Sequence, residues 1–277
     1  MSHPRQLAVS ICVYRPDLEV LEKALRSLRA AVEYAAARRA LATRVYIADN
    51  SPGAGRASPP ARLLGEALAG SPACKGEYIA SGGNIGYGRA NNLAIARSNA
   101  DYFLVMNPDV FPDPDSIERA LDYMEYYPGA GLVLADVRGE GGERHYLCKR
   151  NPTLFDLFLR SFAPGFLRRR FEGRMREFEM RDRDYGAPIH GVPYPTGCFM
   201  FFRGDILRRL GGFDPRFFMY LEDADIGRRT LELADVVYVP AVRIVHQWAR
   251  GSHRTWRLRW VTIQSGFRYW RKWGGAW

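Results

Sequence analysis

Cysteine is scarce and widely spaced in this sequence, which has 4 cysteines among 277 residues. They are Cys12, Cys74, Cys148 and Cys198. Because no two of them stand at the short spacing of a metal knuckle or a disulfide framework, we expect free and mostly buried thiols. No apolar run approaches the roughly 20 residues that a membrane-spanning helix needs. The N-terminus also lacks the charged and then apolar layout of a signal peptide, so we expect a cytoplasmic protein.

Acidic residues and tryptophans are distributed unevenly along the chain. No acidic residue follows Asp235, and no tryptophan precedes Trp248. The C-terminal tail instead carries most of the net charge of +10, together with all 6 tryptophans. Its basic residues are Arg243, Arg250, Arg254, Arg257, Arg259, Arg268, Arg271 and Lys272. Basic residues interleaved with aromatic ones suit nucleic acid, an anionic membrane surface or an anionic substrate.

Alternating strand and helix signals predict an α/β fold. A β-branched apolar run over residues 7–13 is followed by apolar residues at helical spacing over 18–37 and by a second strand run over 44–48. Strand, helix and strand in this order form the unit of a parallel sheet. Further strands are predicted over residues 103–106, 132–137 and 236–239, and residues 194–202 are predicted to form a turn that leads into a buried strand. Helices are predicted over 63–68, 90–99, 116–126, 204–210 and 226–231. A chain of 277 residues fits one large α/β domain or two small lobes.

A carboxylate follows the buried run of residues 103–106. The run stops at Asn107, Pro108 and Asp109, because proline has no N–H to give to the sheet. Open α/β sheets bind their ligands at the carboxyl ends of their strands. The hypothesis is that Asp109 holds a divalent metal on a nucleotide diphosphate, and the alternative is a turn aspartate that bonds its own backbone.

Two further stretches have the residue types of a functional site. Residues 82–92 contain four glycines within seven positions and precede a helix, so the backbone can approach a phosphate closely there. The stretch is neither a Walker loop nor Gly-x-Gly-x-x-Gly, and a structural turn is the alternative. Residues 222–225 bring three carboxylates to the head of a helix, a crowding of like charge that a cation or a proton-transfer role would justify.

Six ordered motifs resemble those of the inverting family 2 glycosyltransferases, in particular the bacterial rhamnosyltransferase-like branch. They are residues 9–14 (VSICVY), 49–51 (DNS), 83–91 (GNIGYGRAN), 107–109 (NPD), 211–225 (GGFDPRFFMYLEDAD) and His246. The resemblance covers nearly the whole chain. It implies a GT-A fold: a Rossmann-like, mostly parallel central sheet flanked by helices, followed here by a basic and aromatic helical tail.

The resemblance also implies a donor side of the site. Asp49 would bond the nucleotide base, for which a carboxylate suits the imide N–H of uracil or thymine, and Arg89 would bind the diphosphate. Asp109 and His246 would hold Mg²⁺ or Mn²⁺, although the first position of the metal motif is the amide Asn107, a weaker ligand for a hard cation. The residues assigned to the donor are Val13, Tyr14, Asp49, Asn84, Gly86, Arg89, Asn91, Asn107 and Asp109.

On the acceptor side, Asp223 matches the catalytic base of the family. An inverting transfer requires a carboxylate that takes the proton as the acceptor hydroxyl attacks. Thr196, Gly197 and Cys198 match the segment that lines the sugar pocket. Glu222 and Asp225 either orient the acceptor or, for Asp225 above all, cap the helix that follows.

The tail offers a separate prediction. Six of its apolar residues fall on spacings of three, four or seven and can share one helical stripe. They are Trp256, Trp260, Ile263, Phe267, Trp270 and Trp277. Flanked by arginines, such a helix could lie in a membrane interface near a lipid-linked acceptor, at the cytoplasmic face of the inner membrane. Packing onto the protein's own core and packing onto a second subunit, as in a homodimer, are the alternatives.

The interpretation that follows is a cytoplasmic, metal-dependent inverting glycosyltransferase. The sugar is expected to be L-rhamnose from dTDP-L-rhamnose, and the acceptor a hydroxyl of a bacterial surface glycan, either lipopolysaccharide O-antigen or cell wall. A UDP-hexose transferase is the alternative within the class, and a nucleic-acid- or membrane-binding protein without enzyme activity is the alternative outside it. Residues 1–250 would form one catalytic domain, with a donor half (1–110) and an acceptor half (111–250), and residues 251–277 an amphipathic helical segment.

Overall fold

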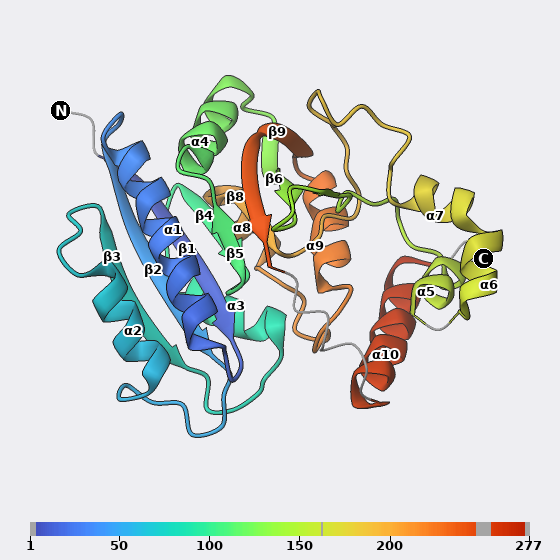
Figure 1. The fold of residues 1–277 in the computed structure, drawn as a ribbon, viewed down its shortest axis with the longest axis horizontal. Helices are drawn as coiled ribbons and strands as arrows, with labels where there is room; N and C mark the ends of the chain where they lie inside the picture. The colour runs from blue at the N-terminus through green and yellow to red at the C-terminus, as the bar shows by residue number, and fades with distance from the viewer. Residues whose placement is uncertain (1–3, 162, 248–255, 275–277) are drawn as a thin grey trace.

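A computed structural model describes residues 4–161, 163–247 and 256–274. Its strands are β1 (Arg5–Val13), β2 (Leu41–Asp49), β3 (Cys74–Ala80), β4 (Tyr102–Met106), β5 (Val110–Pro112), β6 (Ala130–Arg138), β7 (Arg144–His145), β8 (Phe199–Arg203) and β9 (Asp235–His246). Its helices are α1 (Leu18–Ala36), α2 (Pro59–Leu68), α3 (Tyr87–Ile95), α4 (Ser116–Tyr126), α5 (Leu154–Ser161), α6 (Gly165–Arg170), α7 (Glu172–Phe178), α8 (Gly204–Leu210), α9 (Glu222–Leu231) and α10 (Trp256–Trp273). Figure 1 shows one central sheet with helices on both sides.

The sheet is parallel in its first half and mixed as a whole. The strand order is β3-β2-β1-β4-β8-β6-β9-β5, with β7 paired to β6. The pairings of β1 with β2, β2 with β3 and β1 with β4 are parallel, as the strand-helix-strand signals predicted. Strand β8 then inserts antiparallel between β4 and β6. The predicted parallel character therefore holds for the N-terminal half, while the second half mixes the two directions.

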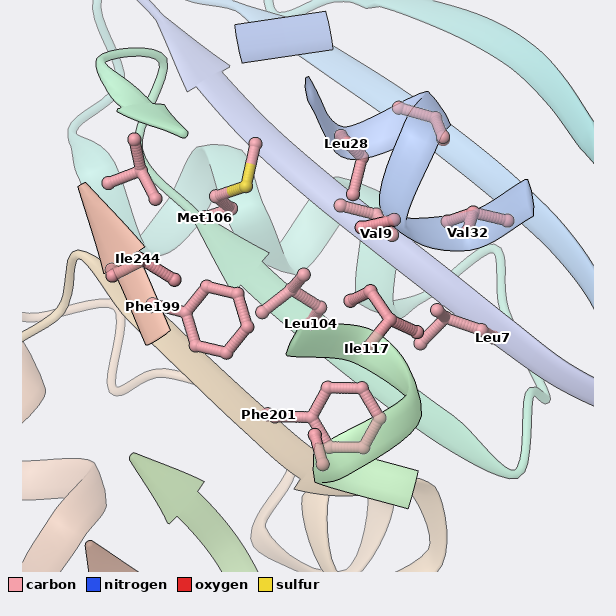
Figure 2. Close-up of a cluster of buried hydrophobic side chains, with 14 of the residues drawn as sticks. Leu7, Val9, Leu28, Val32, Leu104, Met106, Ile117, Phe199, Phe201 and Ile244 are labelled. Carbon is pink, nitrogen blue, oxygen red and sulfur yellow. The ribbon is translucent and has the colours of Figure 1, made fainter. Parts of the chain in front are cut away.

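The core lies between the sheet and its covering helices. Figure 2 shows side chains from elements that are distant in sequence packing together, among them Val9 of β1, Val32 of α1 and Phe201 of β8. Phe201 is fully buried and stacks on Tyr102 with ring centroids 5.7 Å apart. Burial of each such side chain contributes about 1.5–3 kcal/mol. Truncation of Phe201 to alanine would cost about 3–5 kcal/mol, since it also leaves a cavity.

Several element boundaries differ from those predicted. The helices over residues 116–126 and 204–210 agree with α4 and α8, and α3 begins three residues earlier than the predicted 90–99 helix. Strand β3 was not predicted, because its burial pattern has no clear alternation and Gly76 interrupts it. A Cβ on Gly76 would lie 2.8 Å from Leu64 Cγ, so glycine lets α2 approach the sheet closely.

Helix α10 packs on the protein's own domain with one face. Ser265 Oγ donates to the Met219 carbonyl (2.7 Å), and Tyr269, only 3% exposed, donates to Asn151 Oδ1 (3.3 Å). In Figure 1 the helix lies beside α5, and the two elements are in contact. Of the three alternatives for the tail, packing onto the protein's own core is confirmed for this face.

The predicted apolar stripe of α10 is not the packed face. Trp260, Ile263 and Phe267 are 60%, 48% and 55% exposed. The side chain of Trp256 and all of Trp277 lie outside the described residues. Within the part of the chain that the structure describes, no helix combines the length and the apolar character required to cross a bilayer.

Candidate active site

Asp49 ends β2 at the carboxyl edge of the sheet, beside the end of β1. Its carboxylate is 1% exposed, and it accepts hydrogen bonds from the Ser51 N–H (2.8 Å) and from the Tyr78 hydroxyl (2.7 Å). Burial raises the pKa of Tyr78 to about 12, so this hydroxyl remains a donor. These bonds fix the direction of the Asp49 carboxylate, and its proposed bond to a base stays a prediction. At the end of β1, Val13 is buried, whereas Tyr14 is 47% exposed.

The glycine-rich loop packs against the segment that carries the catalytic candidates. Gly86 has φ +97°, and a Cβ there would lie 2.5 Å from the Phe218 carbonyl oxygen, so only glycine fits. The next residue, Tyr87, donates its N–H to the same carbonyl (2.9 Å). Asn84, on the exposed side, accepts from the Gly86 N–H (3.3 Å). The loop thus ties the start of α3 to residue 218, and the need for glycine at position 86 is explained without a phosphate.

Two residues assigned to the donor lie elsewhere. Asn91 is fully buried, and its amide accepts from Ser10 Oγ (2.7 Å) and donates to the Tyr87 carbonyl (3.1 Å). The assignment of Asn91 to the donor is therefore wrong, because both ends of its amide are bonded inside the fold. Arg89 is exposed, donates Nε to the Pro215 carbonyl (2.7 Å) and lines a cavity with residues of α10.

Asp109 and His246 lie side by side, as the sequence predicted. They meet because β5, which begins at Val110, pairs with the end of β9, with Val110 opposite His246. Nε2 of His246 lies 3.2 Å from Oδ1 of Asp109. Burial lowers the pKa of His246, but the bonds to Asp109 and Cys198 outweigh it and raise this pKa to about 10.

The donor set here is small. Among the described residues no group of three or more His, Cys, Asp or Glu side chains could hold a metal ion. Asn107, the third candidate, accepts from the Tyr87 hydroxyl (3.1 Å) through Oδ1. One carboxylate oxygen and one imidazole nitrogen at this separation fit two positions around a divalent cation, with phosphate oxygens and water completing the shell. The residues present therefore fit a metal that a nucleotide diphosphate helps to hold.

Glu222 and Asp223 open α9 directly after a strained turn. Tyr220 and Leu221 have φ +69° and +64°, a left-handed conformation that non-glycine residues rarely adopt twice in succession. Leu221 is held there by burial among Phe217 and Tyr194. Such strain is typical of functional sites, and here it turns the chain so that both carboxylates enter the first turn of a helix.

Glu222 is buried, Asp223 is partly buried, and the two carboxyl groups have few partners. Asp223 accepts from the Gly197 N–H (3.2 Å) and from the Ala224 N–H (2.9 Å). Glu222 is 6% exposed, and its Oε2 has no hydrogen-bond partner among the described residues. Burial raises the pKa of both groups, and together with the charge of Asp223 it raises that of Glu222 to about 8. A buried carboxyl whose pKa is raised toward neutrality suits proton transfer.

The predicted sugar-pocket segment holds this pair in place. The Gly197 N–H bonds Asp223, and its carbonyl accepts from the Tyr87 hydroxyl (2.9 Å). Thr196 Oγ1 accepts from Lys149 Nζ (2.9 Å) and donates to the Leu147 carbonyl (2.8 Å). Cys198 is buried behind them, and the four cysteines are free and buried, as predicted.

Lys149 and Tyr87 belong to the site, and the sequence reasoning missed both. Lys149 is 2% exposed, and burial lowers its pKa to about 7, followed by the charge of Arg160. Its positive charge in turn opposes the rise in the pKa of Asp223. Tyr87 stands within the quoted glycine motif, so its position could have suggested a role. Lys149 stands between Cys148 and Arg150 with no pattern around it, so nothing in the sequence pointed to it.

Asp225 is an anchor rather than a cap. Its side chain is completely buried, with 0% exposure, and it pairs with Arg229 (2.9 Å) and Lys272 (2.7 Å). Trp273 Nε1 donates to it as well (2.9 Å). The N-cap of α9 is Leu221, without a side-chain bond. Both the capping and the substrate-binding interpretation of Asp225 are wrong, because α10 takes its carboxylate.

Comparison with known proteins identifies this arrangement. The family model described as glycosyl transferase family 2 matches residues 9–211, which include the ends of β1, β2 and β4 and the Thr196–Gly197 segment. The chain belongs to glycosyltransferase family 2.

Curated relatives include rhamnosyltransferases. The chain is 32% identical over 206 residues to the rhamnosyltransferase WbbL of Escherichia coli K12, covering 70% of this chain and 72% of that protein. It is 29% identical over 191 residues to the N-acetylglucosaminyl-diphospho-decaprenol L-rhamnosyltransferase of Mycobacterium tuberculosis. That match covers 64% of this chain and 60% of the mycobacterial protein.

Solved structures support the fold. A mannosyltransferase from Pyrobaculum calidifontis, solved in complex with GDP-Man and Mn²⁺, aligns over 99% of this chain and 66% of its own, with a TM-score of 0.60 and 16% identity. TarS of S. aureus aligns over 88% of this chain and 37% of its own, with a TM-score of 0.55 and 13% identity. The predicted GT-A fold is confirmed.

Proposed function

We propose that this glycosyltransferase is an inverting enzyme that transfers L-rhamnose from dTDP-L-rhamnose to a hydroxyl of a bacterial surface glycan, with Asp223 as the general base. The observation that carries the proposal is the state of Asp223. It is a partly buried carboxylate whose pKa is raised by desolvation, held by two backbone N–H groups at the head of α9. The rhamnosyltransferase relatives support the choice of sugar.

Asp223 performs the proton transfer in this mechanism. The acceptor hydroxyl attacks the anomeric carbon as the bond from that carbon to the diphosphate oxygen breaks, and the hydroxyl proton passes to a carboxylate oxygen of Asp223. A single displacement of this kind inverts the configuration at the anomeric carbon. The Gly197 N–H orients the carboxylate, and Lys149 favours its charged form electrostatically.

Asp109 and His246 would hold the metal, Mg²⁺ or Mn²⁺. When bound, a divalent cation neutralises the charge that grows on the departing nucleoside diphosphate. Because the described residues supply only these two ligands, metal affinity should be weak without nucleotide and rise when a nucleoside diphosphate is present. Titration calorimetry with Mn²⁺, with and without dTDP, measures this difference, and tight binding of Mn²⁺ alone would contradict it.

The identity of the nucleotide in the donor has the strongest alternative. Asp49 can accept from the imide N–H of either thymine or uracil, so a UDP-hexose donor is the alternative. A nucleic-acid-binding role for the basic tail gains no support, since that role leaves the Asp223 arrangement without a task. We assign the protein to the cytoplasmic face of the inner membrane, where nucleotide sugars and lipid-linked acceptors meet.

A donor panel tests the proposed function. The protein is incubated with dTDP-L-rhamnose, UDP-hexoses and GDP-mannose, each with Mg²⁺ or Mn²⁺, and nucleotide release and thermal shift are measured. The expected result is stabilisation and turnover with dTDP-L-rhamnose above the other donors. Preference for a UDP-hexose would establish the alternative donor, and no response to any donor would contradict the enzyme assignment.

A further inference from the structure

A strongly cationic cavity lies beside the catalytic segment and has no role in the mechanism above. Its volume is about 490 Å³, within the range of ligand-binding pockets. It lies where the start of α3, the turn before α9 and the last turns of α10 meet. Its lining residues are Arg89, Arg216, Phe217, Arg268, Arg271 and Lys272.

Only part of this positive charge is neutralised by the protein. Asp214 pairs with Arg216 (2.6 Å) and with Lys272 (2.8 Å), and Lys272 also pairs with Asp225. By contrast, the remaining three lining cations, Arg89, Arg268 and Arg271, form no ion pair with any carboxylate of residues 4–161, 163–247 and 256–274. Three unpaired guanidinium groups on one cavity repel one another unless an anion enters it.

The geometry of the guanidinium groups favours phosphate as the anion that the cavity binds. A guanidinium presents a planar fork of N–H donors that matches two phosphate oxygens, and several such forks suit a diphosphate better than a single carboxylate. We propose that the cavity binds the diphosphate of a lipid-linked acceptor. This inference rests on the proposed function, because it names the class of acceptor that the enzyme would use.

The exposed stripe of α10 accounts for the lipid. Trp260, Ile263 and Phe267 are 60%, 48% and 55% exposed, and with about 3.6 residues per turn they share a face next to the one that carries Arg268 and Arg271. The opposite face, with Tyr269 and Trp273, is packed on the domain. Aromatic and aliphatic side chains beside arginines are typical of helices that lie in a membrane interface. A lipid against the stripe would present its diphosphate to the cavity.

The cavity also borders the turn that leads to the proposed catalytic carboxylate. Phe217 lines it and lies in the turn that leads to Glu222 and Asp223. On the other side, Lys272 lines it and bonds Asp225, on the same turn of α9 as Asp223. Asp109 and His246, assigned to the donor diphosphate, are absent from the lining. Under this proposal, a sugar joined to the bound diphosphate would extend from the cavity toward the start of α9 while the donor occupies its own site.

The first experiment asks whether a second diphosphate site exists. Binding of inorganic pyrophosphate is measured by calorimetry in the full chain with dTDP and Mn²⁺ at saturation, so that the donor site is filled. We expect binding in the wild type and a loss of at least about tenfold in affinity, or ~1.4 kcal/mol, in Arg268→Gln/Arg271→Gln. The matched control is Arg62→Gln/Arg169→Gln, which removes the same charge at two exposed arginines outside the cavity and should bind pyrophosphate as the wild type does.

The second experiment separates a lipid diphosphate from a merely anionic surface. Sedimentation is compared with phosphatidylcholine vesicles that carry a polyprenyl diphosphate and with phosphatidylcholine/phosphatidylglycerol vesicles of equal surface charge. Preference for the lipid diphosphate, lost in Arg268→Gln/Arg271→Gln, supports the proposal. Equal binding to both vesicles, or pyrophosphate that binds only in competition with dTDP, would overturn it.

The results of both experiments can be interpreted independently of the donor assignment. If the thermal shift with dTDP-L-rhamnose fails while pyrophosphate binding depends on Arg268 and Arg271, the proposed function falls and the cavity remains an anion site. If the donor binds while pyrophosphate affinity is unchanged in Arg268→Gln/Arg271→Gln, the cavity assignment falls alone. Equal thermal unfolding midpoints of this variant and the wild type check that the variant folds.

Discussion

Two pairs of carboxylates within residues 214–225 have opposite surroundings. Asp214 and Asp225 are matched by cations: Arg216 and Lys272 for the first, Arg229 and Lys272 for the second. Glu222 and Asp223 have no cation at ion-pair distance among the described residues, and Glu222 Oε2 has no hydrogen-bond partner there. One short segment thus holds two carboxylates that are paired with cations and two that have no cationic partner.

This difference separates carboxylates that stabilise the fold from carboxylates suited to proton transfer. The bond to Arg216 is the largest influence on Asp214, and with Lys272 it holds the pKa of Asp214 well below its usual range, whereas burial raises the pKa of Glu222 and Asp223. A matched carboxylate stays charged and fixes α10 to the domain. An unmatched one destabilises the fold, and a protein retains it where it must accept a proton.

The largest expected effect is on turnover when Asp223 is changed. Asp223→Asn removes the proposed general base, and we expect kcat to fall about 10³-fold, or ~4 kcal/mol in the activation barrier. Initial rates of nucleotide release with acceptor present measure it. Asp205→Asn, which neutralises an exposed carboxylate of α8, is the control and should retain full activity. Transfer that survives in Asp223→Asn would assign the base to another residue.

Changing a carboxylate of the cation-paired set, Asp214 and Asp225, should lower stability instead of turnover. Asp225→Asn leaves Arg229 without its buried counter-charge and Lys272 with Asp214 alone, and we expect the free energy of unfolding to fall by about 3 kcal/mol. Equilibrium denaturation in guanidinium chloride measures it, with Asp205→Asn again within about 0.5 kcal/mol of the wild type. A stability equal to that of the wild type would show that these ion pairs do not hold α10.

A third prediction concerns pH. The Lys149 charge lowers the pKa of Asp223, which burial raises, so Lys149→Met should raise it further and move the acid limb of kcat/KM to higher pH. On that limb we expect about tenfold lower kcat/KM, the equivalent of ~1.4 kcal/mol. Other charged or titratable groups that face Asp223 remain in place: Glu222, Arg160, Tyr87, Tyr194 and Tyr269. An equal fall at every pH would mean that Lys149 acts only on packing.

The smallest expected effect is at Glu222. Its folded pKa of about 8 lies above the unfolded value of about 4.3, so its native state favours the neutral acid. The stability that this preference contributes is fully present below the pKa of the unfolded state and is lost as pH rises through the pKa of the folded state. Glu222→Gln should therefore be more stable than the wild type by about 1 kcal/mol above the folded pKa and similar to it in acid. Denaturation curves at both pH extremes measure this, and an equal difference at both would refute it.

The sequence predicted the fold well where patterns are local. The apolar runs of β1, β2 and β4 and the helical spacing of α1, with Leu21, Leu25 and Leu28 buried, were sufficient for the parallel half of the sheet. The antiparallel insertion of β8 depends on contacts across about a hundred residues, which no local pattern carries. The stripe on α10 has the predicted helical period and is exposed, whereas Tyr269 and Trp273, which lie outside the stripe, pack on the domain.

The site was predictable where a side chain follows a strand or stands in a motif. Asp109 and His246 meet as expected because their strands pair. Asn91 and Asp225 were assigned by motif position, but their partners, Ser10 and Lys272, come from distant segments and bury them. Lys149 is found only in three dimensions, since burial rather than any pattern gives it its lowered pKa.

The most direct test of the contrast between the two pairs is the unfolding free energy of Asp223→Asn at neutral pH. If Asp223 is a carboxylate without a cationic partner that is kept for catalysis, neutralising it should leave stability within about 1 kcal/mol of the wild type or above it, because removing a partly desolvated charge offsets the lost hydrogen bond. A loss of about 3 kcal/mol, like that expected for Asp225→Asn, would make Asp223 a structural residue and contradict the account.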